Sequence, residues 1–375
     1  MAPRGTTLSA LVTGATGFIG RGIVRRFLAA GRPIVALARG RDGATARERV
    51  AAAVGSLPAD AVLDVVEGDL ALPECGLSRG DWQRLRATVE TVVNCAGDTR
   101  FEPEAIEPYV AGHVHGPQQL LEGLAGGRLA RWAQISTAFV CGRRTGTILE
   151  RDADVGQTFH NTYERVKLDA EQAIRAAGAG HRVDVRVFRP SIIVGAAPMT
   201  AGGNPSNIFF GFIRMLAALA RMPDGAPPLR VAAAPSATFN IVPVEYVAAS
   251  VVALAEHADA KGQTFHLVLR DAPTQAAVLR TITAHLGVHG VCLVDARQET
   301  LKDPSPFERA VARTLEPYRE YLMQDVRFDD ATTATLLQRC GVEHPALSTD
   351  AILRLVDEAL AAGSPCHKRA LAGVG

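Results

Sequence analysis

The sequence predicts an α/β protein with a doubly wound parallel sheet, followed by a smaller, mainly helical C-terminal part. Three observations indicate this fold. Short apolar runs typical of buried strands alternate with helical stretches over residues 8–188, as expected for parallel strands joined by helices. A glycine-rich turn joins the first of these strands to the first helix. The alternation stops between Gly195 and Pro235, which indicates where the second part begins.

The first strand, turn and helix predict a nucleotide-binding unit. Residues 10–12 are apolar, and three glycines at a spacing of three then open a helix that ends at Gly31. A pyrophosphate binds free backbone N–H groups at a helix N-terminus, and any Cβ on the turn would hold the phosphates away. We therefore expect a dinucleotide to contact Gly14, Thr16, Gly17, Phe18, Ile19 and Gly20.

The end of the second strand, residues 33–38, indicates which dinucleotide binds. Where an acidic residue would bind the adenosine 2′-hydroxyl, the sequence has Arg39, with Arg41 close behind. A guanidinium suits a 2′-phosphate, so NADPH is predicted over NADH. The alternative is that an arginine in this loop is simply solvated.

The later strands are expected to end at the same cofactor, because ligands of such sheets bind outside the carboxyl ends of the strands. Residues 41–61 predict a helix, and residues 61–70, 89–94, 129–137 and 183–188 predict strands. Asp69 either accepts from the adenine amino group or is a plain turn residue. The expected cofactor contacts at these ends are Asp69, Leu70, Cys95, Ala96, Gly97, Pro190, Ser191 and Ile192.

The remaining elements define two expected parts. Helices are predicted at 117–125 and at 162–177, the latter stopped by Gly178, and an aromatic-rich helix at 208–216. Residues 242–254 and 265–269 look like a return to the sheet, and helices dominate from Asp271. We therefore expect a dinucleotide-binding domain over 1–195, rejoined by 240–269. A substrate-binding part or lid would comprise 196–239 and 270–375.

Tyr163 and Lys167 are the strongest candidates for catalysis. On a helix, positions four apart share a face, so the hydroxyl and the ammonium are expected in the same space. The cation should stabilise the phenolate and lower the pKa of the phenol from its usual value near 10. Lys167 can also hydrogen-bond the nicotinamide ribose. Thr137, at the end of its strand, is expected to hold the substrate oxygen, while strand alternation turns the neighbouring Ser136 to the opposite face.

Five strings of this sequence carry a resemblance to a known family. They are TGATGFIG, EGDL, ISTAFV, YERVK and FRPSIIVG, and together they resemble the extended short-chain dehydrogenases/reductases, whose fold is of the Rossmann type. The run VEGDLALPECGLSRGDW is similar to the thioester reductase branch, which includes fatty acyl-CoA reductases and the reductase domains of carboxylic acid reductases and nonribosomal peptide synthetases. This resemblance implies NADPH-dependent reduction of an acyl thioester to an aldehyde, or further to an alcohol.

Other functions stay open beside this one. A ketone, an aldehyde or a nucleotide sugar could be the substrate of the same Thr137, Tyr163 and Lys167 set. An NADP-sensing protein without turnover is a further alternative, because the chain departs from the family at His113. The family usually has an asparagine there, which helps to hold a water chain behind the catalytic lysine. A thioester would arrive on coenzyme A or on a separate carrier protein, and a homodimer is an alternative to a monomer.

Composition excludes several classes of function. The formal net charge is +1 and 21% of residues are charged, which argues against a nucleic-acid partner. Six scattered cysteines, at 75, 95, 141, 292, 340 and 366, without a CxxC pair suggest reduced thiols. We expect a cytoplasmic protein without a targeting segment and without stable membrane insertion, since the most apolar stretch, residues 208–222, contains two arginines.

Three further patterns are weaker. Gly76, Ser78 and Gly80 fit a Gly-x-Ser-x-Gly nucleophile motif, but no strand is expected before it and no helix directly after it. His285 and His289 have the helical spacing of metal ligands without a third ligand, so no metal is predicted. The apolar stripe over 208–219 could line an acyl tunnel or touch lipid, and it could equally be a core or subunit-contact helix.

Overall fold

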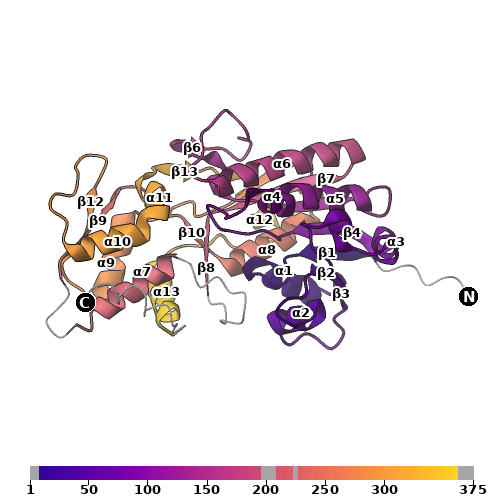
Figure 1. Cartoon of the computed structure of the whole chain (residues 1–375), viewed down its shortest axis with the longest axis horizontal. Coiled ribbons are helices and arrows are strands. Elements are labelled where there is room, and N and C mark those ends of the chain that lie inside the picture. The colour runs from indigo at the N-terminus through magenta and orange to yellow at the C-terminus, as the bar shows by residue number, and fades with distance from the viewer. Residues whose placement is uncertain (1–7, 196–207, 223–226, 362–375) are drawn as a thin grey trace, which may run out of the picture.

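A seven-stranded parallel sheet forms the centre of the computed structural model, which describes residues 8–195, 208–222 and 227–361 (Figure 1). The strand order is β11-β7-β5-β4-β1-β2-β3. The strands are β1 Ser9–Thr13, β2 Ile34–Ala38, β3 Leu63–Glu67, β4 Val89–Asn94, β5 Arg131–Ile135, β7 Asp184–Pro190 and β11 Thr264–Leu267. In register, Val12 of β1 lies between Ala36 and Val93. The chain therefore winds outward from β1 in both directions, which opens a crevice at the carboxyl ends of β1 and β4.

Helices cover both faces of this sheet, because strands buried on two sides need apolar cover on each. One hydrophobic cluster joins inward residues of β1 and β2 to α1 Phe18–Ala29, α2 Ala46–Val54 and α8 Val244–Ala255. A second cluster joins the alternate residues, such as Leu11 and Val35, to α3 Arg79–Thr88, α5 Gly116–Leu124 and α6 Thr162–His181. The predicted doubly wound α/β fold is confirmed.

A second group of elements lies beside the carboxyl ends of the strands, at the left in Figure 1. It contains α7 Ile208–Leu219, β9 Leu229–Ala233, α9 Gln275–Leu286, β12 Val291–Asp295, α10 Pro306–Leu315 and α13 Thr349–Ala361. A third hydrophobic cluster holds these elements together. Strands β9 and β12 pair in parallel, so this part is less purely helical than the sequence predicts.

Short elements connect the two parts. β8 Ile192–Val194 pairs with β10 Ile241–Pro243, and β6 Gly146–Ile148 pairs with β13 Val326–Phe328. α4 Ile106–Val110 runs through a π-helical turn, Ala111–His115, into α5. The segment after α10 forms a 3₁₀ turn, Glu316–Tyr318, and α11 Arg319–Met323, and α12 Ala331–Arg339 packs against the cluster of α1 and α8.

Several helix boundaries differ from the sequence prediction, and α7 continues past residue 216 to Leu219. Helix α2 is shorter than residues 41–61, since Gly55 ends it at a φ of +70°. Helix α6 continues past Gly178 to His181. Gly178 does not stop the helix but packs tightly, because a Cβ there would lie 2.3 Å from Cγ2 of Val185.

Some expectations fall on residues that the structure does not describe. Residues 196–207, 223–226 and 362–375, including Cys366, lie outside the described residues. The proposed boundaries of the substrate-binding part therefore stay a prediction. Over residues 8–195, 208–222 and 227–361, none of the helices combines the length and the apolar character needed to cross a membrane.

Candidate active site

The glycine turn after β1 is shaped by contacts that leave no room for side chains. Gly14 has a φ of +66°, and a Cβ there would lie 2.8 Å from the backbone nitrogen of Ala96. At Gly20, a Cβ would lie 2.2 Å from the carbonyl oxygen of Gly14. Helix α1 begins after Gly17, which gives no side-chain cap, and its first turn contains no acidic residue. Its first N–H groups are therefore available to an anion.

Buried polar side chains fix the strand ends beneath this turn. The hydroxyl of Thr13 donates to Oδ1 of Asn94 over 2.5 Å and accepts from the backbone nitrogen of Ala96 over 3.1 Å. Asn94 Nδ2 donates to Oε1 of Gln134 over 3.0 Å. The row joins β1, β4 and β5. The sequence analysis did not predict this role of Thr13. The signal that could have indicated it is a polar residue at the end of an otherwise apolar strand.

Arg39 and Asp69 form an ion pair at the far end of the crevice. Nη1 of Arg39 lies 3.2 Å from Oδ2 of Asp69, and the arginine side chain is 59% exposed. Asp69 Oδ1 also accepts from the backbone nitrogen of Ala71 over 3.0 Å, so it has the contact of a turn residue as well. Five of the expected cofactor contacts lie outside the lining of the main cavity, namely Thr16, Arg39, Asp69, Leu70 and Ala96.

Thr137, Tyr163 and Lys167 come together in one cavity of about 520 Å³. The lining also includes ten of the other expected cofactor contacts: Gly14, Gly17, Phe18, Ile19, Gly20, Cys95, Gly97, Pro190, Ser191 and Ile192. Thr137 follows β5, and Tyr163 and Lys167 lie on the first turns of α6. Nζ of Lys167 donates to the carbonyl oxygen of Ile135 over 2.7 Å.

The expected effect of Lys167 on Tyr163 is wrong for this structure. Burial raises the pKa of Tyr163 to about 12, although a side-chain hydrogen bond with Thr137 opposes the rise. Burial also lowers the pKa of Lys167 to about 8. The ammonium group is directed to a main-chain carbonyl, and the loss of solvent around the phenol outweighs any stabilisation of the phenolate.

Ser136 and Thr137 both line the cavity, contrary to the expected alternation. The alternation fails because β5 ends at Ile135, before either residue. The hydroxyls of Ser136 and Ser191 are buried and have no hydrogen-bond partner among the described residues. Since a buried hydroxyl without a partner is unfavourable, this part of the cavity wall suits a polar ligand.

His113, the departure from the family pattern, lies in the wall of the same cavity. Its imidazole is buried on the π-helical turn, and a Cβ on Gly97 would lie 2.8 Å from Cε1. Nε2 lies 3.0 Å from both the backbone nitrogen and the carbonyl oxygen of Asp98. Burial, followed by the positive charge of Lys167, lowers the pKa of His113 to about 3. The imidazole is therefore neutral over the physiological pH range.

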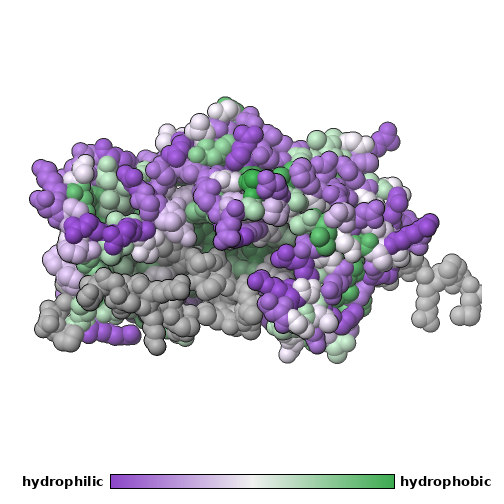
Figure 2. Space-filling model, viewed as in Figure 1, coloured by the Kyte–Doolittle hydropathy of each residue, from purple (hydrophilic) through white to green (hydrophobic). Residues whose placement is uncertain are grey.

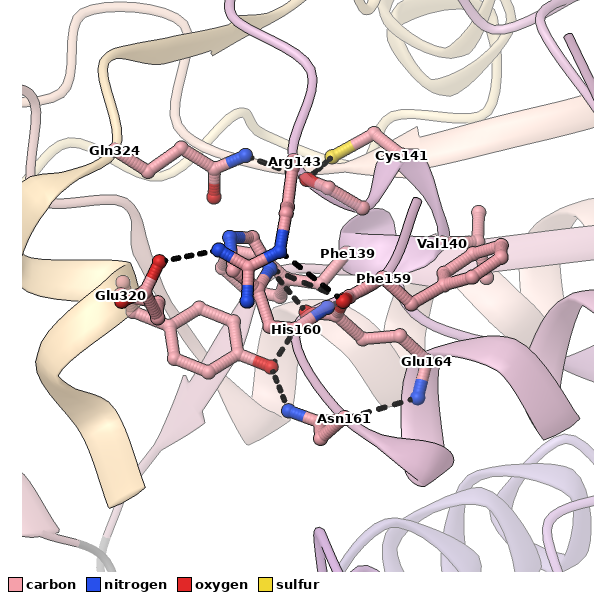
Figure 3. Close-up of polar contacts among 12 residues, drawn as sticks. Phe139, Val140, Cys141, Arg143, Phe159, His160, Asn161, Glu164, Glu320 and Gln324 are labelled. Atoms are coloured by element: carbon pink, nitrogen blue, oxygen red, sulfur yellow. Dashed lines mark hydrogen bonds and ion pairs between the residues drawn. The ribbon is translucent and has the colours of Figure 1, made fainter. Parts of the chain in front are cut away.

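A polar network next to Tyr163 joins α6 to the C-terminal part (Figure 3). The fully buried carboxylate of Glu164 accepts from the backbone nitrogen of His160 over 2.9 Å and lies 3.0 Å from Nδ1 of its ring. Tyr321 of α11 donates to Oε1 of Glu164 over 2.5 Å and accepts from Nδ2 of Asn161 over 2.7 Å. The sequence analysis missed Tyr321, because 157 residues separate it from Glu164.

The weaker sequence motifs have structural roles. Ser78 caps α3, which begins at the next residue, so the expectation that no helix follows the motif is wrong. Its hydroxyl donates to Asp81 over 2.6 Å. His285 lies 3.6 Å from Asp357, and the described residues contain no group of three or more acidic, His or Cys side chains that could hold a metal ion. The stripe on α7 is core in part, since Ile213 is fully buried.

Comparisons with known proteins agree with this arrangement. The model of the NAD-binding family described as Male sterility protein matches residues 12–251, more than half of the chain. Peramine synthetase A of Epichloe festucae is 31% identical over 206 residues, which cover 51% of this chain and 7% of that protein. Carboxylic acid reductase of Mycobacterium tuberculosis is 26% identical over 294 residues, which cover 71% of this chain and 25% of that protein.

The chain thus spans a quarter or less of the length of these two curated relatives. Among solved structures, the terminal R domain from the myxalamid PKS-NRPS biosynthetic pathway superposes with a TM-score of 0.74 at 20% sequence identity. The superposition covers 96% of this chain and 90% of that chain. The chain belongs to the NAD-binding male sterility protein family, and its resemblance to the thioester reductase branch of the extended short-chain dehydrogenases/reductases is confirmed.

Proposed function

We propose that this protein is an NADPH-dependent reductase that converts an acyl thioester to an aldehyde, with further reduction to an alcohol as the alternative product. One observation carries the proposal. The hydroxyls of Thr137 and Tyr163 and the ammonium of Lys167 line the same cavity as the uncapped N-terminus of α1. A carbonyl held by two hydroxyls beside a dinucleotide site is the arrangement that carbonyl reduction needs.

The residues of the crevice fit a nicotinamide dinucleotide. Side chains on the turn would collide with the backbone at Gly14 and Gly20, so the turn keeps its N–H groups accessible to a pyrophosphate. At the other end, the unpartnered hydroxyls of Ser136 and Ser191 suit the polar edge of a nicotinamide. We assign the contacts along this path to the residues expected from the sequence, including Thr16, Leu70 and Ala96 on the adenine side.

Arg39 would select NADPH. Its ion pair with Asp69 is exposed, and exposed pairs are worth at most about 1 kcal/mol. Little stability is therefore lost when the guanidinium leaves Asp69 and binds a 2′-phosphate, with which it can form two hydrogen bonds. Asp69 would then be available to the adenine amino group.

The chain's own groups account for the rest of the reaction. When bound, NADPH supplies the hydride. Thr137 and Tyr163 orient the thioester carbonyl and stabilise the negative charge that develops on its oxygen. Since the pKa of Tyr163 is raised to about 12, the phenol keeps its proton at neutral pH and gives it to that oxygen. The hemithioacetal formed in this way collapses to the free thiol and the aldehyde.

Lys167 and His113 support the cavity wall beside Thr137 and Tyr163. The ammonium of Lys167 donates to the carbonyl oxygen of Ile135 and has further hydrogens for the nicotinamide ribose. His113 is neutral and keeps a fixed contact with Asp98, so it adds no second positive charge behind Lys167. The proposed role of His113 is therefore to order this wall, as the family's asparagine does.

The nature of the thioester follows from the relatives. The curated relatives include a carboxylic acid reductase, which supports an acyl substrate. We propose that the acyl group is delivered as a thioester of coenzyme A or of a carrier protein.

The deciding experiment measures NADPH oxidation with acyl-CoA thioesters and with the matching aldehydes, and identifies the products. We expect thioester-dependent oxidation that yields the aldehyde, and a loss of at least about a hundredfold in kcat for Tyr163→Phe. Oxidation with aldehydes or ketones alone would refute the thioester assignment. Activity of Tyr163→Phe within a few-fold of wild type would refute the role of the phenol, and binding of NADPH without any turnover would favour a sensing function.

A further inference from the structure

The cavity continues beyond the reacting groups into the C-terminal part. There it is walled by six apolar side chains from five elements, which we call the distal chamber: Phe212 of α7, Val231 of β9, Leu279 and Ile282 of α9, Leu293 of β12 and Leu315 of α10. Figure 2 shows hydrophobic residues gathered in a recess between this part and the sheet. The proposed reaction itself requires none of these side chains.

The walls of the distal chamber belong to a packed core. Val231, Leu279 and Ile282 are 6%, 7% and 1% exposed, and they share a hydrophobic cluster with Ile352 and Val356 of α13. Because packed cores resist collapse and deformation, the chamber is a preformed space.

Charge is absent from this end of the cavity. Among the described lining residues, the acidic and basic groups and histidine are Asp98, His113 and Lys167, and all three belong to the sheet side. Three polar side chains of the cavity lining donate to main-chain carbonyls: Thr238 to Val326, Asn240 to Leu269 and Gln275 to Leu322, over 2.9 to 3.0 Å. Their donors are therefore already satisfied.

A series of aromatic rings leads from Tyr163 toward the chamber. The centroid of Phe101 lies 6.3 Å from that of Tyr163 and 5.2 Å from that of Tyr318. Tyr318 lies three residues after Leu315, which is a wall residue of the chamber. A molecule whose carbonyl contacts Tyr163 can thus extend along apolar surface into the chamber.

We infer that the distal chamber binds the hydrocarbon chain of the acyl group, so that this protein selects uncharged acyl thioesters of medium or greater chain length. The inference rests on the proposed function, and it adds a substrate class. Burial of each methylene contributes about fourfold in affinity, whereas a charged group in this space would lack any partner and is excluded. A peptidyl or aminoacyl thioester with a free ammonium group is therefore a poor substrate.

The test combines binding with turnover. Calorimetry of the full chain with butanoyl-, octanoyl- and dodecanoyl-CoA gives affinities that need no catalysis, and NADPH oxidation gives kcat/KM for the same series. We expect each quantity to rise by about fourfold per methylene until the chamber is full. Succinyl-CoA, which has a carboxylate at the end of a chain as long as that of butanoyl-CoA, should fall at least about a hundredfold below butanoyl-CoA.

Two variants test whether the acyl chain binds in the distal chamber. Ile282→Phe fills the space and should lower the ratio of kcat/KM for dodecanoyl- over butanoyl-CoA by at least tenfold. Ile352→Phe adds the same ring to the same core away from the cavity lining, and it should leave this ratio unchanged. If both variants unfold, Ile282→Ala and Ile352→Ala replace them, and only Ile282→Ala should shift the preference to longer chains.

The outcomes separate this inference from the proposed function. Acyl-CoA affinity that depends on chain length, without NADPH oxidation, would refute the proposed reaction but would support the chamber as an acyl-binding site. Turnover that is equal for all chain lengths, or that favours succinyl-CoA, would overturn the inference while the reductase assignment stands. An equal shift of the ratio in the Ile352 variant would also overturn it.

Discussion

The hydroxyl of Tyr321 should stabilise the protein markedly, and Tyr321→Phe removes that hydroxyl alone. The ring keeps its contacts with Phe101 and Phe139, whose centroids lie 5.4 and 5.0 Å away. The variant loses a hydrogen bond to the buried carboxylate of Glu164 and another from Asn161. Hydrogen bonds to charged groups contribute about 1.5 to 3 kcal/mol and neutral ones about 1 kcal/mol. We therefore expect a loss of about 3 kcal/mol.

The measurement is the thermal unfolding midpoint followed by circular dichroism. A loss of this size should lower the midpoint by about 4 °C in a chain of this length. Tyr318→Phe is the matched control, because Tyr318 also lines the cavity and packs on Phe101, but no partner for its hydroxyl is seen among the described residues. A midpoint within 1 °C of wild type for Tyr321→Phe, or an equal loss for Tyr318→Phe, would refute the argument.

Three further predictions concern the cofactor site. Gly20→Ala places a methyl group 2.2 Å from the carbonyl oxygen of Gly14, so the affinity for NADPH, measured by fluorescence, should fall at least tenfold. Gly180→Ala on α6 is the control, because its methyl group meets nothing within 4 Å. This control should raise the free energy of unfolding by about 0.5 to 1 kcal/mol. Lys167, with a pKa of about 8, should make kcat fall as pH rises through 8, and a profile that stays flat to pH 9.5 would contradict its role. Arg39→Ala should raise KM for NADPH about tenfold or more without changing KM for NADH, and equal effects on both would speak against 2′-phosphate recognition.

The effect of Lys167 on stability has the opposite pH dependence to its effect on catalysis. Its pKa is lowered from 10.5 in the unfolded chain to about 8. Between these pH values the unfolded state binds the extra proton, so the contribution of Lys167 to stability rises with pH through this window. Below about pH 8 the buried ammonium destabilises the fold. The fold therefore retains a destabilising buried charge at the position where the proposed reaction uses it.

The sheet, and the position of the candidate catalytic residues in one cavity with the glycine turn, were predictable because both follow from local spacing. Each motif is short in sequence: one is the set of glycines at 14, 17 and 20, and the other is the pair Tyr163 and Lys167. Tyr321 could not be predicted in the same way, since its contact with Glu164 depends on how α11 packs onto α6. The direction of the pKa shift of Tyr163 was also predicted wrongly, because the burial that raises this pKa depends on all the elements that form the cavity.

Strand β7 depends on chain that is made much later. Its neighbour β11 begins at Thr264, after α7, β9 and α8 have been synthesised, so one edge of β7 stays unpaired during that interval. Arg186 and Arg189 lie on this strand and are almost fully buried in the finished fold, where they pair with Asp184 and Glu171. Both carboxylate partners are made before β11, since Asp184 begins β7 and Glu171 lies on the preceding α6. The two ion pairs therefore place charge on the strand while its edge is open, and charged side chains make an open edge a poorer template for another molecule.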